Sequence, residues 1–511
     1  MKQSRIRYKS FDQISIADSL VYSKLPRHPF WSNIEAKIDF SFADSLCAVL
    51  YSERGQHPYA PSLKLKIHLI QTYYNLSDRQ TEEKIMGDLF IKRFLGLPVD
   101  FFGFDHSTIG LDRSRMGAAM FHACHLYILA QMYSSHGLWG DANEQWIIDS
   151  FPSQASLAMV NTCQLIRQSI ENNLRHLERK HPAMYARLKQ SVPLDAMDMR
   201  ISANSSKGDR MVAFSKLVAQ AYGLLQWFET EEAMLLFSHW PDKQAQQKSL
   251  ELRAVLKQIL EENTRPYDPN RGGKSSRRED EASEPLPNLA FEKIPRDDRP
   301  KNRIVSAYDP EARIAKKSKT VKIQGYKIQN LCTSSGVILE TRAIPATEHD
   351  RDAMVDMVKG TADFFRTLPS AVLGDTLYGH GKQRAALAAI NVSVVAPVTK
   401  TQNPTGLFDI SRFTYNRDTD TYCCPNGKET IRKARNNKLE GWQHFFAETD
   451  CGSCSSMESC TTGKCRSIFH SDYYDLYEAA SVFNETTEGR ALHLLRYIVE
   501  RKTRSSKLIV C

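Results

Sequence analysis

Apolar residues recur at helical spacing in the first part of the chain, and this pattern predicts an all-helical region over residues 1–136. An apolar stretch over residues 63–74 is followed by Ser77, which is a good N-cap for a helix over residues 79–89. Short helices with exposed basic side chains are typical of a helical DNA-binding module, and an ordinary helical domain with a solvated basic face fits the pattern equally well. The candidates for DNA contact are Arg79, Arg113 and Arg115.

The pattern changes near residue 137. Residues 145–150 form a short apolar run that ends in a carboxylate, which predicts a buried strand with Asp149 at its C-terminal end. Residues 155–262 return to helical spacing, and we interpret their leucines as core contacts of a helical insertion without chemistry of its own. Residues 263–303 combine low hydrophobicity with mixed charge, which predicts a flexible linker.

Strand patterns dominate from residue 304. Alternation over residues 321–328, a turn at 333–336 and an apolar run over 337–344 predict a hairpin. Beyond it the pattern predicts, in order, a helix over 350–368, a strand over 370–375, a helix over 383–390 and a strand over 392–398. This order is typical of an α/β layer.

Two aspartates, Asp149 and Asp375, each end a predicted strand. Carboxylates so placed meet at one edge of a sheet, where paired acidic oxygens suit Mg²⁺ or Mn²⁺, although capping a turn is a common role for aspartate in this position. A third carboxylate, Glu500, lies on a predicted amphipathic helix over residues 488–507, one turn after Arg496. Glu500 is placed to complete a metal site, with Arg496 orienting it or contacting phosphate; a surface ion pair between the two is the alternative.

Six of the eleven cysteines fall between residues 423 and 465, a clustering that favours metal binding in a reducing compartment. The Cys451-x-x-Cys454 pair is the strongest part of the pattern, and Cys424 before Pro-Asn-Gly provides the other side of a tetrahedral Zn²⁺ site. Unmetallated thiols are the alternative. The ligands that we expect are Cys424, Cys451, Cys454 and Cys460, with Cys423 and Cys465 as alternates.

Charge and composition narrow the class of protein. Lysine and arginine number 68 against 59 aspartates and glutamates, a net charge of +9 that is compatible with nucleic acid as a partner. A hydrophobic fraction of 41% with 25% charged residues is globular and excludes a wholly disordered or fibrous chain. No apolar run approaches the roughly 20 residues of a membrane-spanning helix, and residues 1–10 lack the pattern of a signal peptide. We therefore expect a cytoplasmic protein with no membrane partner.

Short motifs follow one another along most of the chain. In the N-terminal half they occupy residues 28–31, 51–55, 58–61, 76–80 and 94–97, and end with Asp105-His106-Ser107-Thr108. In the C-terminal half they occupy residues 148–150, 309–313, 325–327 and 496–500, and include Gly374-Asp375-Thr376-Leu377-Tyr378-Gly379. In this order the motifs resemble the DDE transposases of bacterial insertion sequences, in the class with an InsH-like N-terminal domain.

The resemblance implies an α/β RNase H-like catalytic core whose three metal-binding carboxylates map to Asp149, Asp375 and Glu500. These would hold two Mg²⁺ or Mn²⁺ ions, hydrolyse double-stranded DNA at the element's ends, and join the freed 3′-hydroxyl to target DNA by in-line attack. The resemblance also supports a structural Zn²⁺ ribbon before the glutamate and implies a homo-oligomer close to the nucleoid. Further candidates for DNA contact are Lys319, Lys322 and Lys327, with a solvated strand face as the alternative.

The expected organisation has seven parts. They are an N-terminal helical DNA-binding domain (1–136), the first part of the core (137–154), a helical insertion (155–262), a flexible linker (263–303), the second part of the core (304–415), a Cys-rich zinc-ribbon-like insertion (416–470) and a C-terminal helix that completes the core (471–511). The leading hypothesis is a transposase that binds terminal inverted repeats. A catalytically inactive DNA-binding protein derived from such an element, and a metal-dependent nuclease without strand joining, are the alternatives.

Overall fold

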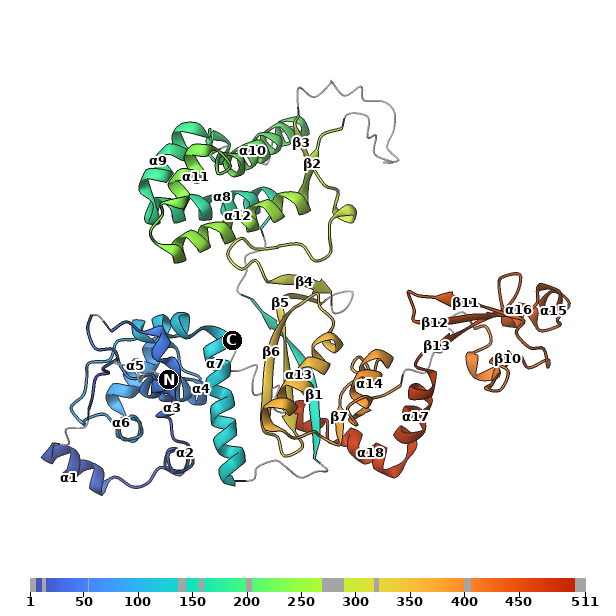
Figure 1. The fold of residues 1–511 in the computed structure, drawn as a ribbon, viewed down its shortest axis with the longest axis horizontal. Coiled ribbons are helices and arrows are strands. Elements are labelled where there is room, and N and C mark those ends of the chain that lie inside the picture. Colours follow the sequence, from blue (N-terminus) through green and yellow to red (C-terminus); the bar gives the residue numbers. More distant parts are fainter. Residues whose placement is uncertain are drawn as a thin grey trace. The chain divides into compact units, whose positions relative to one another are not determined.

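The computed structural model describes residues 6–11, 15–53, 55–136, 144–155, 160–198, 205–268, 289–316, 321–398 and 406–500 (Figure 1). These residues form two compact units. The first unit draws on Met1–Ser150, Gln329–Arg342 and Asp350–Cys511, and the second on Phe151–Ile328 and Ala343–His349. No helix in the described part of the chain is long and apolar enough to cross a membrane.

The N-terminal part of the first unit is helical, which confirms the prediction. Its elements are α1 (Ile16–Lys24), α2 (Trp31–Lys37), α3 (Phe42–Leu46), the 3-10 helix η1 (Cys47–Leu50), α4 (Pro61–Tyr74), α5 (Asp78–Gly87), α6 (Leu89–Leu95) and α7 (Ser107–His136). Helix α5 starts as predicted, because the Ser77 side chain accepts from the Gln80 amide while Gln80 caps Ser77 in return. The helices enclose a core that includes Trp31, Ile67 and Phe94.

Helix α7 links these helices to a sheet. It changes direction at Gly117, whose φ of 60° lies outside the helical range. Beyond this kink, His125 Nε2 donates to the Leu339 carbonyl at 3.2 Å, and Leu129 is buried in the sheet's own core. Figure 1 shows α7 running alongside the strands.

The sheet of the first unit has a mixed topology. Its strands are β1 (Gln145–Gln154), β5 (Lys322–Thr333), β6 (Ile338–Pro345), β7 (Ala371–Leu373) and β8 (Ser393–Val395), joined by helices α13 (Asp350–Phe365) and α14 (Gly381–Ala388). The order is β5-β1-β7-β8, with β6 paired to β5. Strands β1, β7 and β8 are parallel, whereas the predicted hairpin of β5 and β6 turns at Gly336. The α/β layer predicted from the sequence is therefore confirmed.

The two faces of this sheet bury different residues. Trp146 and Ile148 of β1 pack in one cluster with Met354 and Met357 of α13. Ile147, between them in sequence, belongs to a second cluster on the opposite face, because successive side chains of a strand point to opposite sides. The second cluster contains residues from the C-terminal end of the described chain.

Two boundaries of predicted elements are wrong. Strand β1 does not end after Asp149 but continues to Gln154, since Phe151 is buried and the Ala155 amide still donates to the Gln324 carbonyl at 2.8 Å. The C-terminal helix α18 (Thr487–Leu494) ends early. The Leu495 amide donates to the carbonyl three residues before it, a tight turn, and helical conformation resumes at residues 497–500.

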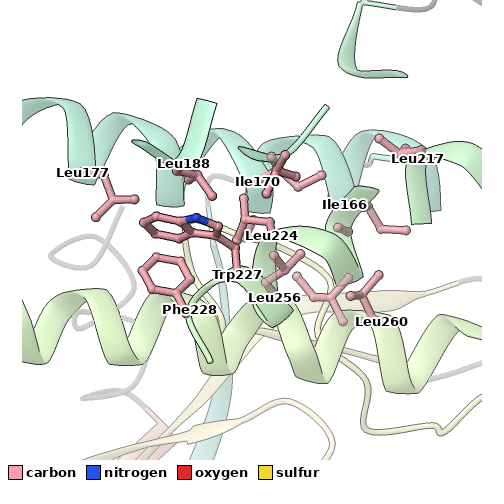
Figure 2. Packing of buried hydrophobic residues seen from close by; sticks show 14 of the residues in the cluster. Ile166, Ile170, Leu177, Leu188, Leu217, Leu224, Trp227, Phe228, Leu256 and Leu260 are labelled. Carbon is pink, nitrogen blue, oxygen red and sulfur yellow. The ribbon is translucent and has the colours of Figure 1, made fainter. Parts of the chain in front are cut away.

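The second unit contains the helical insertion. Its elements are α8 (Thr162–Lys180), α9 (Pro182–Ser191), η2 (Asp195–Met197), α10 (Lys207–Trp227), α11 (Glu231–Ser238), α12 (Lys243–Asn263), β2 (Thr264–Pro266), β3 (Phe291–Lys293), η3 (Arg296–Asp298) and β4 (Arg313–Lys316). Figure 2 shows Trp227 and Phe228 among aliphatic side chains that include Leu224 and Leu256. The helical spacing thus marks core contacts, as the sequence predicts.

The prediction of a flexible linker over residues 263–303 is wrong at both ends of that segment. Strands β2 and β3 pair antiparallel. Phe291 stacks on Tyr222 with ring centroids 5.0 Å apart, and the amides of Ala290 and Phe291 both donate to Ser215 Oγ at 3.0 Å. The polar average over the whole segment conceals this aromatic anchor. Residues 269–288 lie outside the described part of the chain.

The Cys-rich segment folds into a small β-module within the first unit. Its elements are η4 (Ile410–Arg412), β9 (Thr414–Asn416), β10 (Thr421–Cys423), β11 (Arg432–Asn436), β12 (Gly441–Phe445), α15 (Glu448–Gly452), α16 (Met457–Cys460) and β13 (Ser467–Ser471), followed by α17 (Tyr474–Glu485). Phe413, Tyr422, Phe446 and Ile468 form its own buried core. This core is too small to stabilise a module alone, which leaves room for a metal to contribute.

Candidate active site and cysteine cluster

The pairing register of β1 and β7 brings two aspartates together. The strands run parallel, and Ile147 lies beside Leu373. Two residues further along both strands, the same register places Asp149 beside Asp375. Neighbouring strands are about 4.8 Å apart, so these carboxylates start from adjacent backbone positions.

Both aspartates face the side of the sheet that the C-terminal segment covers. The paired residues that precede each of them by two positions belong to the apolar cluster that also contains Val499, and residues two apart on a strand share a face. Val499 is 1% exposed, so this segment is firmly packed on that face. Glu500 follows it directly, which brings the third acidic residue to the same side.

The electrostatics of Asp149 agree with this placement. Burial is the main cause that raises the pKa of the Asp149 carboxyl above its usual value. The negative charges of Asp375 and Glu500 raise the pKa further, whereas the Ser150 amide and the Arg496 guanidinium lower it. The three carboxylates therefore repel one another within one site. A divalent cation relieves this kind of repulsion.

The turn after β7 is built around Asp375. Its Oδ1 accepts from the Leu377 amide at 2.8 Å, the turn-capping role that the sequence also allowed. Tyr378 is fully buried and packs on Gly374, where a Cβ would come within 2.8 Å of the Tyr378 side chain. The motif that the sequence presents as Gly-Asp-Thr-Leu-Tyr-Gly is thus a rigid turn that fixes one carboxylate oxygen.

A buried arginine holds the end of this turn. The Arg384 guanidinium of α14 donates to the carbonyls of Gly379 (2.8 Å), Val394 (2.6 Å) and Ala396 (2.9 Å). Burial lowers its pKa, and the three carbonyl partners satisfy the cation without a carboxylate. Sequence reasoning missed Arg384, because an arginine within an apolar helix resembles a surface residue unless its partners are known.

A second positioning contact lies behind Asp149. Ser150 Oγ donates to Asp350 Oδ2 at 2.6 Å at the start of α13, and Gln329 donates to the Asp350 carbonyl at 2.6 Å. Tyr378 lies beside these groups, and its pKa is raised mainly by burial and then by the charge of Asp350. Sequence reasoning missed this contact too, although Ser150 belongs to the motif around Asp149 and was therefore a signal for it.

The C-terminal segment reaches the site through its own contacts. Asn484 Nδ2 donates to the Ala396 carbonyl at 3.0 Å, which ties α17 to the strand end that Arg384 also holds. Arg496 and Glu500 form an ion pair one turn apart, with Nη2 and Oε1 separated by 3.9 Å. The Glu500 side chain is half exposed, so this pair is a weak one and leaves the carboxylate available.

The three carboxylates are neighbours but not in contact. Among the described residues, the ligand oxygens of Asp149, Asp375 and Glu500 do not all lie within 4.8 Å of one another. A pair of metal ions about 4 Å apart needs carboxylates that bridge and flank it. The donor set therefore fits divalent cations in chemistry and placement, with a short inward movement needed on binding.

The N-terminal helices do contain a group of three potential ligands at that separation, namely Glu82, Asp105 and His106. His106 Nδ1 donates to Glu82 at 2.8 Å, and Asp105 accepts from the amide of Ser107 at 2.7 Å. These bonds organise the start of α7. They explain the Asp-His-Ser motif without a metal.

Two family models match this chain. Residues 19–115 match a model described as Transposase domain (DUF772), and residues 298–504 match a model described as Transposase DDE domain. The chain belongs to the DDE transposases. The second match includes Asp375 and Glu500, and Asp149 lies between the two matched segments. No curated protein and no solved structure matches the chain.

The identification settles the class of chemistry. A DDE transposase is a phosphoryl-transfer enzyme that binds DNA and uses divalent metal ions. The transposase places a helical N-terminal region before a mixed α/β sheet, the arrangement expected of an RNase H-like DDE domain. The particular substrate, the number of metals and the residue roles are matters for the proposal below.

The structure places the predicted DNA contacts of this transposase in different settings. Arg79 and Lys322 are exposed, and Lys319 lies outside the described residues. Arg113 donates to both carboxylate oxygens of Asp78, at 2.8 and 2.6 Å, and Arg115 lies over the Tyr51 ring. Lys327 donates to the Glu348 carbonyl. Arg113, Arg115 and Lys327 therefore have partners within the protein.

The four cysteines expected to bind zinc gather at one cavity of about 250 Å³ in the β-module. Cys424, Cys451, Cys454 and Cys460 all line it. Burial raises the pKa of the Cys460 thiol, and the other three cysteines raise it further, so the four sulfurs share one environment. No three of them lie within 4.8 Å of one another in the described residues.

Hydrogen-bond donors also point at these sulfurs. Cys424 Sγ accepts from the Lys428 amide at 3.4 Å, and Cys451 Sγ from the Arg466 amide at 3.5 Å. Amide-to-sulfur bonds stabilise a thiolate, the form that binds metal. The basic strand beside them is largely occupied: Arg435 pairs with both oxygens of Asp472, at 2.6 and 2.7 Å.

Proposed function

We propose that this transposase serves a bacterial insertion sequence, binds its terminal inverted repeats, and catalyses Mg²⁺-dependent DNA cleavage and strand transfer through Asp149, Asp375 and Glu500. The observation that carries the proposal is the β1–β7 register, which sets the two aspartates side by side on the face that Val499 and Glu500 cover. The raised pKa of Asp149 supports it, because Asp375 and Glu500 both contribute.

Two Mg²⁺ or Mn²⁺ ions fit this donor set. When bound, they supply electrostatic stabilisation of the phosphate and activation of a water or 3′-hydroxyl. The protein's own residues do the positioning. Asp149 and Asp375 bind from fixed strands, Glu500 from the packed C-terminal segment, and Arg496 offsets their negative charge. Arg384 holds the turn that aims Asp375.

Among the predicted DNA contacts, Arg79, Lys322 and Arg496 are the strongest candidates. The first two are exposed, and Arg496 lies beside the carboxylates. The proposal also includes double-stranded target DNA, a homo-oligomer that holds paired ends, and a place on DNA in the bacterial cytoplasm. Self-association follows from the need to act on two element ends together.

A strand-transfer assay with terminal-repeat DNA and Mg²⁺ tests the proposed activity. Joined product is the expected result, and Asp375→Asn should abolish cleavage while DNA affinity is retained. Cleavage without joining would assign a metal-dependent nuclease instead. DNA retention without cleavage would assign a catalytically inactive DNA-binding protein. Unchanged cleavage in Asp375→Asn would remove that residue from the mechanism.

We also propose that Cys424, Cys451, Cys454 and Cys460 bind one structural Zn²⁺ in a zinc-ribbon-like fold. Their shared cavity, the thiolate-stabilising amides and the small core of the module support this assignment. Binding would draw the two cysteine-bearing loops closer together. Cys423 and Cys465 remain outside the cavity lining, which supports their place as alternates.

A further inference from the structure

The helical insertion contains a basic cleft that the proposed chemistry does not use. A cavity of about 760 Å³ lies within the second unit between the N-terminal turns of α8 and α10 and strand β3. Its apolar lining comes from Met211, Phe214 and Phe291. Its charged lining consists of four cations, Arg167, Lys207, Arg210 and Lys293, and one carboxylate, Glu292.

The single carboxylate does not balance these cations. Glu292 Oε1 accepts from Arg265 Nε at 2.5 Å, so its charge is already paired. Lys293 has a lowered pKa because of burial and then because of the nearby Arg299 charge. Arg299 is in turn affected by Arg303 and Arg296. Positive charge therefore accumulates along this edge of the unit.

The two helices add to the same field. Asn161 caps α8 and lines the cavity, and Lys207 is the first residue of α10. Helices of 19 and 21 residues thus direct their positive ends toward one cleft. Cations around an apolar floor suit a sugar–phosphate backbone, whose charge meets the rim while its sugars meet the floor.

We propose that this cleft binds the phosphate backbone of the transposase's DNA, so that the insertion is a second DNA-contacting surface in addition to the N-terminal helices and the catalytic face. The inference rests on the proposed function for its choice of ligand. Contacts to backbone phosphates carry no sequence information, so the cleft contributes affinity for any duplex rather than recognition of the terminal repeat.

The salt dependence of duplex binding by the full chain tests this proposal. Lys207→Gln/Lys293→Gln should lower the slope of log affinity against log salt by about 2, because each phosphate that a lysine no longer neutralises lowers the slope by about 0.9. The matched control is Lys248→Gln/Lys257→Gln, which removes two exposed cations from α12 that pair with glutamates and do not line the cleft. This control should lower the slope much less.

Binding is measured without added Mg²⁺, so cleavage plays no part. An equal slope in the cleft variant and the wild-type chain would overturn the proposal and leave the catalytic assignment intact. Failure of the wild-type chain to bind any duplex would instead overturn the proposed function.

A second measurement needs no folded variant. Cys163 also lines the cleft and is half-buried, so bound duplex should slow its alkylation at least severalfold, as followed by peptide mass spectrometry. The buried Cys332 of the sheet provides the reference for global opening. Protection of Cys163 by inorganic phosphate but not by duplex would assign the cleft to a small phosphorylated molecule and overturn the proposal.

Discussion

Asp149 and Asp375 lie at the same level of adjacent parallel strands, each two residues beyond a directly paired position. This relationship links residues more than two hundred positions apart in sequence through backbone hydrogen bonds rather than through side-chain chance. It also explains why the pKa of Asp149 responds to Asp375. Backbone register thus supplies the geometry from which the proposed metal chemistry begins.

The raised pKa of Asp149 predicts a pH dependence of stability. An acid whose folded-state pKa is raised destabilises the folded protein once it is ionised, so its penalty is absent below the ordinary aspartate pKa and complete above the raised value. Without metal, Asp149→Asn should therefore have a higher Tm than wild type at pH 7, and the difference should vanish toward pH 3. Calorimetry in metal-free buffer measures this, and a lower Tm of the variant at pH 7 would contradict it.

Added Mg²⁺ should reverse that dependence. The cation binds ionised carboxylates, so the Tm increase on adding Mg²⁺ should grow as pH rises through the raised pKa of Asp149. Thermal unfolding at several pH values with and without Mg²⁺ checks this expectation. An Mg²⁺ effect that is equal at pH 4 and pH 7 would place the bound ion elsewhere.

Arg384 should matter to stability and activity although it touches no substrate. Arg384→Met removes three hydrogen bonds to buried carbonyls and should cost about 3 kcal/mol or more in unfolding free energy. Cleavage should fall because the Asp375 turn loses its fixed position, whereas duplex affinity should stay the same. Lys382→Met on the same helix is the control, since Lys382 is exposed. Equal stability of the two variants would remove Arg384 from this role.

The cysteine assignment predicts which thiols hold metal. Cys454→Ser should reduce zinc content from about one ion per chain to a small fraction of that, as measured by elemental analysis. Cys465→Ser should retain the zinc, because Cys465 does not line the shared cavity. Loss of zinc from the second variant, or its retention in the first, would redraw the ligand set.

Much of the site could be predicted because its signals are local. Asp375 ends a short apolar strand, Ser77 caps a helix, and Cys451 and Cys454 have ligand spacing within a few residues. The remaining features depend on partners distant in sequence. Strand β1 extends past Asp149 because a long neighbouring strand continues to pair with it, and Arg384 is satisfied by carbonyls that only the fold assembles. Composition over a window also concealed Phe291, whose stacking partner lies on another element.

The central claim is that Asp149, Asp375 and Glu500 together hold divalent cations. Titration of the full chain with Mn²⁺, followed by electron paramagnetic resonance of the free ion, measures it directly. We expect two bound ions per chain, and at least one fewer in Asp149→Asn and Asp375→Asn. The control Asp363→Asn changes an exposed aspartate of α13 and should bind as wild type does. Undiminished Mn²⁺ binding by both site variants would contradict the account.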